Sequence, residues 1–525
     1  MVTKPHGESQ AAPALGQAVL RGSFWMLVNT VVTRGVSLLA TIVLGRLLDD
    51  HAWGIYGLAM SAATIVGTLR DGGVRQLLIQ RPAEYESLIG PVFWLATAFN
   101  VACGAALGLA GPLVARATGE PQVAALLWVI AASLPLGTPG VILQARLAMQ
   151  LRFKAVGLVQ CSSGVVRFGG AMALASAGVG PMSFVLPLIA CALLEWAMAW
   201  WLVREGPWAR KAEVGRWRGM LAGTLWIMLG SLGIALLNWG SSLAVKPFVP
   251  TEVVGAYFFA FQIVVQVGIL LSSNLNAVLF PALARLVNEP DRLAAAAARA
   301  LRQVMLLAAP MSVGLAVTFP ALEQLFFAGK KSNSVLAVLI QGATYAFAVM
   351  LAVPLSVQQA RGRFRSWAIG LVSTAGAGLA AAATGAWLHG TPEGIAAWSG
   401  GATAVTGLGY ALVVLKRIGV PRRVSVASSI PAWVGSLVCG ALAWSLDTHL
   451  AAAPIPMQAM PLPASWQAPM SQALRCVLVG ACFAVSYAVL ARVFLRAHVQ
   501  EAVAVLPARL RPLVEGVMRT RTIAP

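Results

Sequence analysis

Three ionisable side chains stand deep inside long apolar stretches of this sequence. Arg34 lies midway along residues 23–45, Arg167 lies at the middle of residues 156–178, and Glu195 lies in the apolar stretch that follows. An isolated arginine at the centre of a bilayer costs about 2.5–3.5 kcal/mol on insertion scales. Such a side chain needs a partner of opposite charge or a polar cavity, and we expect the two arginines to face a cavity.

Glu195 is the only acid near the middle of an apolar stretch, and it allows two interpretations. It could form a structural ion pair with Arg167, because the two residues lie on consecutive stretches. It could instead bind a coupling ion, Na⁺ or H⁺, since carboxylates inside membranes often serve as ion or proton sites. The first interpretation concerns stability alone, whereas the second concerns transport.

Uncharged polar side chains follow the same helical faces as the arginines. Residues three, four or seven apart share one face of a helix. The polar residues expected to line a cavity are Thr30, Ser37 and Thr41 with Arg34, Gln160 and Ser163 with Arg167, and Ser231, Asn238, Gln262, Gln266 and Asn276 in the second half of the chain. Hydrogen bonds between helices explain the hydroxyl groups equally well.

The composition requires a lipid environment for most of the chain. Of the 525 residues, 58% are hydrophobic and only 11% are charged, and the mean hydropathy is +0.78. Ordinary soluble proteins have about 25% charged residues. One soluble core could not bury this much apolar sequence, which excludes a soluble enzyme.

The apolar stretches predict an all-α polytopic membrane protein with about fourteen transmembrane helices. Each crossing needs about 20 apolar residues. The predicted spans are 23–45, 54–69, 87–112, 123–141, 156–178, 182–203, 219–242, 253–280, 303–328, 334–356, 366–388, 394–415, 427–446 and 472–491. The first stretch is too long for the core of a signal peptide, so we interpret it as a retained helix.

The net charge of +20 would suggest nucleic acid in a soluble protein, but the positions of the charges favour a membrane explanation. With the N-terminus inside, the inner segments hold 29 of the 38 Lys and Arg residues and the outer loops hold 5. Cytoplasmic loops of membrane proteins carry this excess. We therefore expect a multi-pass protein of the bacterial inner membrane with both termini in the cytoplasm and no nucleic-acid partner.

Internal echoes predict two pseudo-symmetric six-helix lobes. GRLLDDHAWGIY at 45–56 resembles VKPFVPTEVVGAY at 245–257, and QARLAMQLRFK at 144–154 resembles QARGRFR at 359–365. The predicted parts are a cytoplasmic tail 1–22, an N-lobe 23–203, a basic linker 204–218 on the anionic inner leaflet, a C-lobe 219–415, a two-helix appendage 416–495, and a cytoplasmic tail 496–525. Coincidence between loops under similar constraints is the alternative.

The sequence carries no pattern typical of an enzyme or a metal site. There is no GxxxxGK[ST] motif for a nucleotide, no nucleophile elbow and no cluster with metal-ligand spacing. The six cysteines lie within apolar stretches and form no CxxC pair. We therefore predict no catalytic residue, no metal and no cofactor beyond a coupling ion.

The first 80 residues resemble the Wzx-type polysaccharide repeat-unit flippases of the multidrug/oligosaccharidyl-lipid/polysaccharide exporter superfamily. The matching features are Arg34 in the first helix, Arg-Leu-Leu at 46–48, Gly-x-Tyr at 54–56, and the segment from Asp71 to Arg81. Arg-Phe-Lys at 152–154 and Phe-Pro-Ala-Leu at 280–283 are similar to the family as well. Order and spacing, more than any single motif, carry this resemblance.

This resemblance implies two six-helix lobes around a central cationic cavity and two further helices. It also implies that the chain moves undecaprenyl-diphosphate-linked oligosaccharide to the periplasmic leaflet by alternating access, beside a polysaccharide polymerase and chain-length proteins. Arginine binds phosphate oxygens with a planar pair of donors, so Arg34 and Arg167 are the expected diphosphate ligands. Of these, Arg34 matches the family's first-helix arginine, whereas Arg167 is inferred from its position alone.

Other functions remain open from the sequence. A polymerase or ligase would need catalytic groups on an outer loop, and the loop 447–470 offers only Asp447 and His449. A cation-coupled drug exporter of the same superfamily would favour acids in the cavity. A lipid II flippase tends to carry a second arginine where this chain has Ala40, and Gly-Arg-Leu-Leu-Asp at 45–49 replaces the usual Ala-Arg-Leu-Leu-Gly. These departures favour exopolysaccharide, capsule or O-antigen synthesis over lipid II.

Overall fold

Helices dominate the described structure, as the apolar stretches predict. The computed structural model describes residues 29, 32–70, 85–150, 152–217, 225–452 and 464–505, and these contain no β-strand. Within these ranges, eleven helices are long and apolar enough to cross a membrane, or up to twelve if a bent pair counts as one span. The described part of each predicted range is mainly helical, although 219–242 is divided between two helices and 334–356 among three, and the count of fourteen crossings remains a prediction.

The chain divides into two compact units, unit 1 from Met1 to Ala235 and unit 2 from Leu236 to Pro525. The division falls inside helix α9, beyond the predicted linker 204–218. The predicted lobe boundaries therefore stay a prediction.

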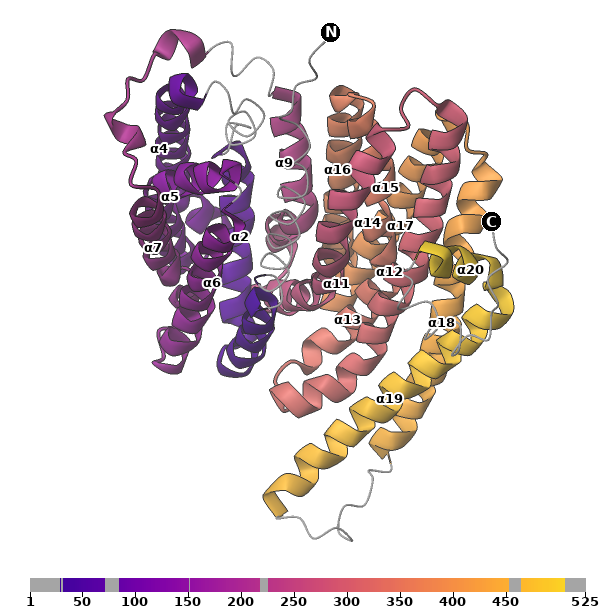
Figure 1. Ribbon diagram of the computed structural model, residues 1–525. Helices are drawn as coiled ribbons and strands as arrows, with labels where there is room; N and C mark the ends of the chain where they lie inside the picture. The colour runs from indigo at the N-terminus through magenta and orange to yellow at the C-terminus, as the bar shows by residue number, and fades with distance from the viewer. Residues whose placement is uncertain are drawn as a thin grey trace, which may run out of the picture. The chain divides into compact units, whose positions relative to one another are not determined.

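Unit 1 is a bundle of antiparallel helices in which α5 packs against both α4 and α7 (Figure 1). A helix at 32–47 precedes α2. The labelled elements are α2 (Asp50–Arg70), α4 (Tyr85–Thr118), α5 (Pro121–Met149), α6 (Phe153–Ser176), η2 (Gly180–Phe184), α7 (Leu186–Val203), η3 (Pro207–Ala209), η4 (Val214–Arg216) and the start of α9 (Leu225–Trp239).

Unit 2 is centred on the long helix α12, which packs against α13, α18 and α19. The labelled elements are α10 (Ser241–Val245), η5 (Lys246–Phe248), α11 (Thr251–Ala284), α12 (Pro290–Phe327), α13 (Ser332–Thr344), α14 (Ala346–Met350), α15 (Ala352–Ala360), α16 (Phe364–His389), α17 (Pro392–Lys416), α18 (Arg422–Ala452), α19 (Ala464–Phe494) and α20 (Arg496–Val505). Its apolar core joins α12, α14, α15, α17 and the end of α19.

The last long helices of unit 2, α18 and α19, form a hairpin (Figure 1). Near the end of α18, Asp447 accepts two hydrogen bonds from Arg475 of α19, at 2.8 Å from Nε and 2.7 Å from Nη2. Asp447 is 4% exposed and Arg475 is 9% exposed. At the other end of α19, Arg302 of α12 binds Glu501 of α20 through two contacts of 2.9 Å. One charge pair thus joins the two helices of the predicted appendage 416–495 to each other, and a second joins α20, in the predicted tail 496–525, to α12.

One helix of the bundle breaks sharply. Helices α9 and α10 meet at an angle of 61° on either side of Gly240. A Cβ atom at Gly240 would lie 2.7 Å from the carbonyl oxygen of Leu236, so only glycine fits this bend. By contrast, α5 continues as a helix through Pro135 and Pro139.

One turn recurs in both units with the same backbone conformation. Arg152 caps the start of α6 with φ −82° and ψ 54°, and Arg363 caps the start of α16 with φ −85° and ψ 55°. Two residues earlier, Gln150 and Arg361 end the preceding helices with φ of −77° and −81°. Phenylalanine follows the capping arginine in both turns. This repeat agrees with a duplication of the helical segments on either side.

Candidate functional site

Arg34 lies on the helix at 32–47 and is partly exposed. Among the residues that the structure describes, no acid forms an ion pair with Arg34. Further along the same helix, the hydroxyl of Thr41 donates to the carbonyl oxygen of Ser37 at 2.9 Å, which is an interaction within one helix. Thr30 falls outside the described residues, so its predicted place beside Arg34 stays a prediction.

Helix α6 carries the predicted polar stripe of Gln160, Ser163 and Arg167 within two turns. The side-chain amide of Asn29 donates to Gln160 Oε1 at 3.0 Å. Gly164 brings the same helix close to Thr33, because a Cβ at Gly164 would lie 3.1 Å from the Thr33 methyl group. The helices that bear Arg34 and Arg167 are therefore direct neighbours inside unit 1.

Glu195 on α7 meets this stripe from the opposite helix. The hydroxyl of Ser163 donates to Glu195 Oε1 at 2.6 Å, and the amide of Gln144 donates to Oε2 at 3.3 Å. Cys191, one turn before Glu195, donates its thiol to the carbonyl oxygen of Ser163 at 3.3 Å. Neutral donors thus hold the carboxylate, and it forms no ion pair with Arg167 within the described part of the chain.

Arg167 contacts aromatic side chains of unit 1. It hydrogen-bonds with the hydroxyl of Tyr56 on α2, and its guanidinium carbon lies 5.6 Å from the centre of the Phe168 ring. Tyr56 in turn stacks on Phe184, with ring centres 4.0 Å apart. Because Tyr56 is itself held by packing, it can orient the guanidinium of Arg167.

The predicted polar residues of the second half of the chain lie on α9 and α11. Gln266 donates to the carbonyl oxygen of Gln262 one turn earlier at 3.2 Å. Ser231 and Asn238 lie on α9 and are half-buried, and the side chain of Asn276 falls outside the described residues. Their assignment to a cavity remains a prediction.

Two participants in the Glu195 and Arg167 contacts were not predicted, namely Gln144 and Tyr56. The sequence analysis ended the fourth span at residue 141, whereas α5 continues to Met149 and buries Gln144. Gln144 is followed by Ala145 and Arg146, and a basic residue there is typical of a helix end, so the sequence offered no reason to extend the span to Gln144. Tyr56 was noted only as part of a repeated Gly-x-Tyr sequence. Only the packing of α2, α5, α6 and α7 identifies them as partners.

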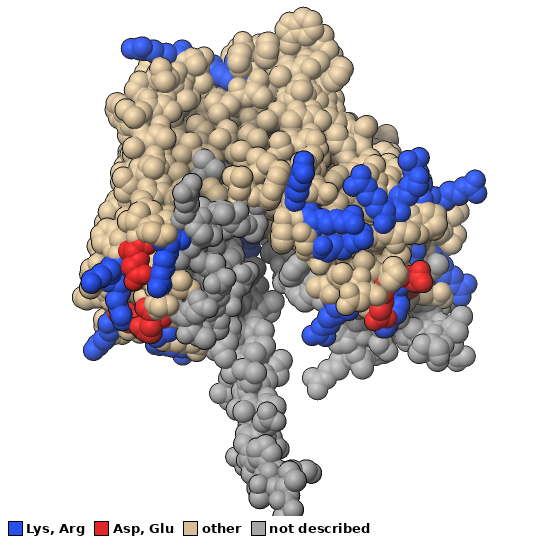
Figure 2. All heavy atoms as spheres, turned by 90° about the horizontal axis from the view of Figure 1, so that it is seen from above, with Lys and Arg blue, Asp and Glu red and all other residues tan. Residues whose placement is uncertain are grey.

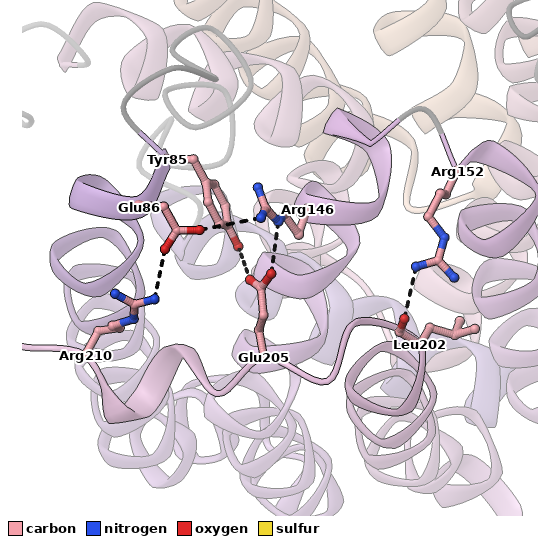
Figure 3. A network of polar contacts seen from close by, with 7 residues as sticks. All are labelled: Tyr85, Glu86, Arg146, Arg152, Leu202, Glu205 and Arg210. Atoms are coloured by element: carbon pink, nitrogen blue, oxygen red, sulfur yellow. Dashed lines mark hydrogen bonds and ion pairs between the residues drawn. The ribbon is translucent and has the colours of Figure 1, made fainter.

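A charged network closes the end of unit 1 at which α4 begins and α5 ends (Figure 3). Arg146 binds Glu205 at 3.2 Å and Glu86 at 3.5 Å, and its guanidinium lies 4.0 Å from the centre of the Tyr85 ring. The Tyr85 hydroxyl donates to Glu205 at 3.1 Å. Arg210 also binds Glu86, at 2.8 Å. Each of these two acids is thus shared between two donors.

The basic segment 204–217 packs on unit 1 through specific contacts. Trp94 of α4 donates to the carbonyl oxygen of Arg210 at 2.9 Å, and Trp208 lies edge-on to Trp196 with ring centres 6.0 Å apart. Arg216 donates to the carbonyl oxygen of Ser87 at 3.4 Å. A position on the inner leaflet remains a prediction for this segment, two of whose arginines, Arg210 and Arg216, contact α4. Counting the charges of each loop could not show that Glu86 and Glu205 would pair with Arg146 and Arg210.

No group of three or more His, Cys, Asp or Glu side chains suited to a metal ion occurs within the described ranges. The arrangement in unit 1 is therefore one of fixed cations, amides, hydroxyl groups and a single carboxylate inside apolar helices. Such a set can bind an anionic group through Arg34 and Arg167 and a small cation or proton through Glu195.

Comparison with known proteins gives two curated relatives. The Escherichia coli "Lipopolysaccharide biosynthesis protein WzxC" is 25% identical over 333 residues, and the Rhizobium meliloti "Succinoglycan biosynthesis transport protein ExoT" is 24% identical over 318 residues. These matches cover 62% and 59% of the chain. They span 66% and 63% of the two relatives, slightly less than two thirds of each.

Solved structures share the fold at low sequence identity. The lipid II flippase MurJ in an inward closed conformation matches with a TM-score of 0.65 and 12% identity, over 87% of this chain and 97% of MurJ. An inward-facing multidrug transporter of the MATE family, in the MOP superfamily, matches with a TM-score of 0.58 and 15% identity, over 76% of this chain and 98% of the transporter. The chain is thus a multi-pass membrane protein with a MOP-type fold.

The family model described as "Polysaccharide biosynthesis protein" matches residues 43–336. This range covers more than half of the chain and includes α2 through the start of α13. It agrees with the resemblance to Wzx-type flippases, which was based on the first helices. The protein therefore belongs to this family of polysaccharide biosynthesis proteins.

Proposed function

We propose that this protein is a flippase for undecaprenyl-diphosphate-linked oligosaccharide repeat units. It moves them from the cytoplasmic to the periplasmic leaflet of the bacterial inner membrane by alternating access, with both of its own termini in the cytoplasm. The product supplies exopolysaccharide, capsule or O-antigen synthesis, beside a polymerase and chain-length proteins. The family match over residues 43–336 is the observation that carries this proposal.

The relatives support the class of substrate. One is named for lipopolysaccharide biosynthesis and the other for succinoglycan biosynthesis transport, and both names concern polysaccharides. The shared fold with a lipid II flippase supports movement of a lipid-linked sugar. No part of the described chain carries the catalytic groups that a polymerase would need on an outer loop.

Arg34 and Arg167 supply the chemistry for a diphosphate. A guanidinium offers two parallel donors that match two phosphate oxygens, and its charge persists at all physiological pH values. Neither arginine has an acidic partner among the described residues, which leaves both guanidinium groups available for a phosphate in this proposal. In the proposed mechanism they bind the diphosphate, while the apolar chain of the substrate stays in lipid.

Glu195 provides a means of coupling. Its carboxylate accepts hydrogen bonds from Ser163 and Gln144. The hydroxyl oxygen of Ser163 and the amide oxygen of Gln144 are the kind of ligands that Na⁺ would need beside the carboxylate. Arg167 lies one turn after Ser163 on α6, and Cys191 lies one turn before Glu195 on α7 and donates its thiol to the carbonyl oxygen of Ser163. In the proposed cycle, gain and loss of a proton or Na⁺ at Glu195 drives the return of the empty transporter.

Reconstituted vesicles provide the test. Purified protein is placed in liposomes that contain a fluorescent undecaprenyl-diphosphate oligosaccharide, and an impermeant reducing agent reports the fraction on the outer leaflet. We expect the wild-type protein to exchange the lipid between leaflets faster than protein-free vesicles do. If Gln262 and Gln266 line the transport path, the double variant Gln262→Ala, Gln266→Ala should exchange it more slowly than the wild type. Exchange at the protein-free rate would contradict the proposal. Polymer formation, or efflux of a cationic dye without lipid movement, would instead support the polymerase or the drug exporter.

A further inference from the structure

Six basic side chains gather on two neighbouring turns of unit 2. The turn between α15 and α16 carries two of them, and the turn between α17 and α18 carries four. We call them the unit 2 basic cluster: Arg361, Arg363, Lys416, Arg417, Arg422 and Arg423. Arg361 is half-buried and the other five are exposed. Figure 2 shows Lys and Arg side chains in groups on this face of the molecule, with Asp and Glu among only some of these groups.

Packing beneath the cluster holds the two turns together. Ile418 and Val420 of the second turn are buried in the same apolar core as Val357 of α15. Helices α16 and α17 pack side by side, and Tyr410 fills the space where Gly370 lacks a Cβ. Two helical turns beyond this contact, Arg363 and Arg417 reach the same level at the end of the pair.

The described part of the chain places no acid against this cluster. Within the described ranges, no ion pair or side-chain hydrogen bond involves any of its six members. Elsewhere at the helix ends of unit 2, Arg292 binds Glu289 and Arg302 binds Glu501. Burial and the like charge of Arg363 lower the pKa of Arg361, as expected for neighbouring cations without an acid between them.

The helix ends add to the positive potential of the cluster. Arg363 caps α16, and Arg422 and Arg423 begin α18, so these arginines stand at helix N-termini. Neither helix has an acid in its first turn. The N-terminus of a helix carries a partial positive charge and favours anions. The general excess of Lys and Arg on cytoplasmic loops does not explain why Arg363, Arg422 and Arg423 stand at helix N-termini.

An apolar surface continues directly from the cluster along the same helices. Phe364 of α16 is 37% exposed, Val413 of α17 is 47% exposed and Val426 of α18 is 39% exposed. Each lies within about one helical turn of a cluster residue. A ligand with an anionic head and an apolar tail could contact both the basic cluster and the apolar side chains beside it, whereas free phosphate could contact only the basic cluster.

We infer that the unit 2 basic cluster is a binding site for an anionic phospholipid, whose phosphate lies between the two turns and whose acyl chains follow Phe364, Val413 and Val426. The like charges of the cluster repel one another in every state of the protein. A lipid that is always present in the leaflet offsets this repulsion continuously, which a transient substrate cannot do. The site is separate from Arg34 and Arg167, and it does not depend on the proposed function.

Binding of defined lipids to the full-length protein in detergent tests this inference by native mass spectrometry. The probes are phosphatidylglycerol, phosphatidylcholine, undecaprenyl diphosphate and inorganic phosphate. The double variant Arg417→Gln, Arg422→Gln is compared with Arg204→Gln, Lys211→Gln, which removes the same charge from exposed positions of unit 1. We expect the cluster variant to bind phosphatidylglycerol about tenfold more weakly or worse, with the control unchanged.

Several outcomes would overturn the inference. Wild-type affinity of the cluster variant for phosphatidylglycerol would do so, as would an equal loss in the unit 1 control, which would indicate unspecific charge attraction. A loss confined to undecaprenyl diphosphate would reassign the cluster to the transported lipid, and a loss confined to inorganic phosphate would indicate a site for a free anion. Thermal unfolding of each variant in lipid-free detergent checks that the fold is intact, and the single variant Arg417→Gln serves if the double variant is unstable.

Discussion

Unit 1 and unit 2 distribute their charged side chains in opposite ways. In unit 1, Arg34, Arg167 and Glu195 lie within apolar helices and form no ion pair among the described residues, while Arg146 and Arg210 at the helix ends are paired with acids. In unit 2, the buried Arg475 is paired with Asp447, while the basic cluster on its turns has no acidic partner.

This difference separates the roles of the charges. A paired charge stabilises the packing of one unit, whereas a charge without a partner in the protein has its binding capacity left for a ligand. In the two proposals above, the charges assigned to ligands lie within the helices of unit 1 and at the helix ends of unit 2. Four substitutions test this contrast, and the largest effect is expected within unit 1.

Arg34→Ala should abolish polysaccharide export while the protein still reaches the membrane. If Arg34 binds the diphosphate, Arg34→Lys should restore only part of the export, because an ammonium group cannot provide two parallel donors. Surface polysaccharide and membrane protein level are measured together for both variants. Full export by Arg34→Ala would remove Arg34 from the mechanism and leave Arg167 as the remaining candidate.

Glu195→Gln should strongly reduce transport and remove its dependence on the pH or Na⁺ gradient. Glutamine can still accept the hydrogen bond from Ser163, but it cannot bind and release a proton or balance the charge of Na⁺. Vesicle transport is measured with and without an imposed gradient, and Ser163→Ala serves as a control for the lost hydrogen bond. Transport by Glu195→Gln that still responds to the gradient would favour a purely structural role.

Arg475→Met should destabilise unit 2 by about 3–5 kcal/mol, because it leaves Asp447 buried without its partner. The double variant Asp447→Leu, Arg475→Met should recover most of this loss, since an apolar pair of similar volume fits the same place. Thermal unfolding of the purified protein in detergent measures both. A double variant as unstable as the single one would show that the pair has a role beyond packing.

Arg146→Gln should have the smallest effect, a loss of about 1 kcal/mol in the free energy of unfolding. It removes two partly exposed ion pairs and the contact with the Tyr85 ring. The matched control is Lys211→Gln, which removes one exposed charge that forms no ion pair within the described ranges and should leave stability unchanged. A loss of several kcal/mol would mean that this network holds segment 204–217 in place more firmly than surface pairs usually do.

The sequence predicted helix ends well where glycine or proline separates two helices. The predicted spans 366–388 and 394–415 agree with α16 and α17 to within a turn, since Gly390 and Pro392 separate them. Prediction was poorer where a helix leaves the apolar layer and continues. Helix α12 begins at Pro290, about three turns before the predicted start at 303, because Ala-rich polar sequence is helical without being apolar.

The candidate site was predicted in part. Helical spacing correctly placed Gln160, Ser163 and Arg167 on one stripe, because that depends on a single helix. It could not show that Glu195 would contact Ser163 and Gln144 in place of Arg167, because contacts between helices depend on their rotation and depth. The predicted cavity, its diphosphate and its coupling ion remain for the experiments above.

The pairing of Asp447 with Arg475 has a consequence for biogenesis. An acid or an arginine that enters the apolar phase alone costs about 2.5–3.5 kcal/mol at the centre of a helix, and less nearer the end. If α18 and α19 leave the translocation machinery as one hairpin, their opposite charges neutralise each other before either meets lipid. A chain truncated after α18 would leave Asp447 without its arginine, so we expect α18 to insert more efficiently when α19 follows it.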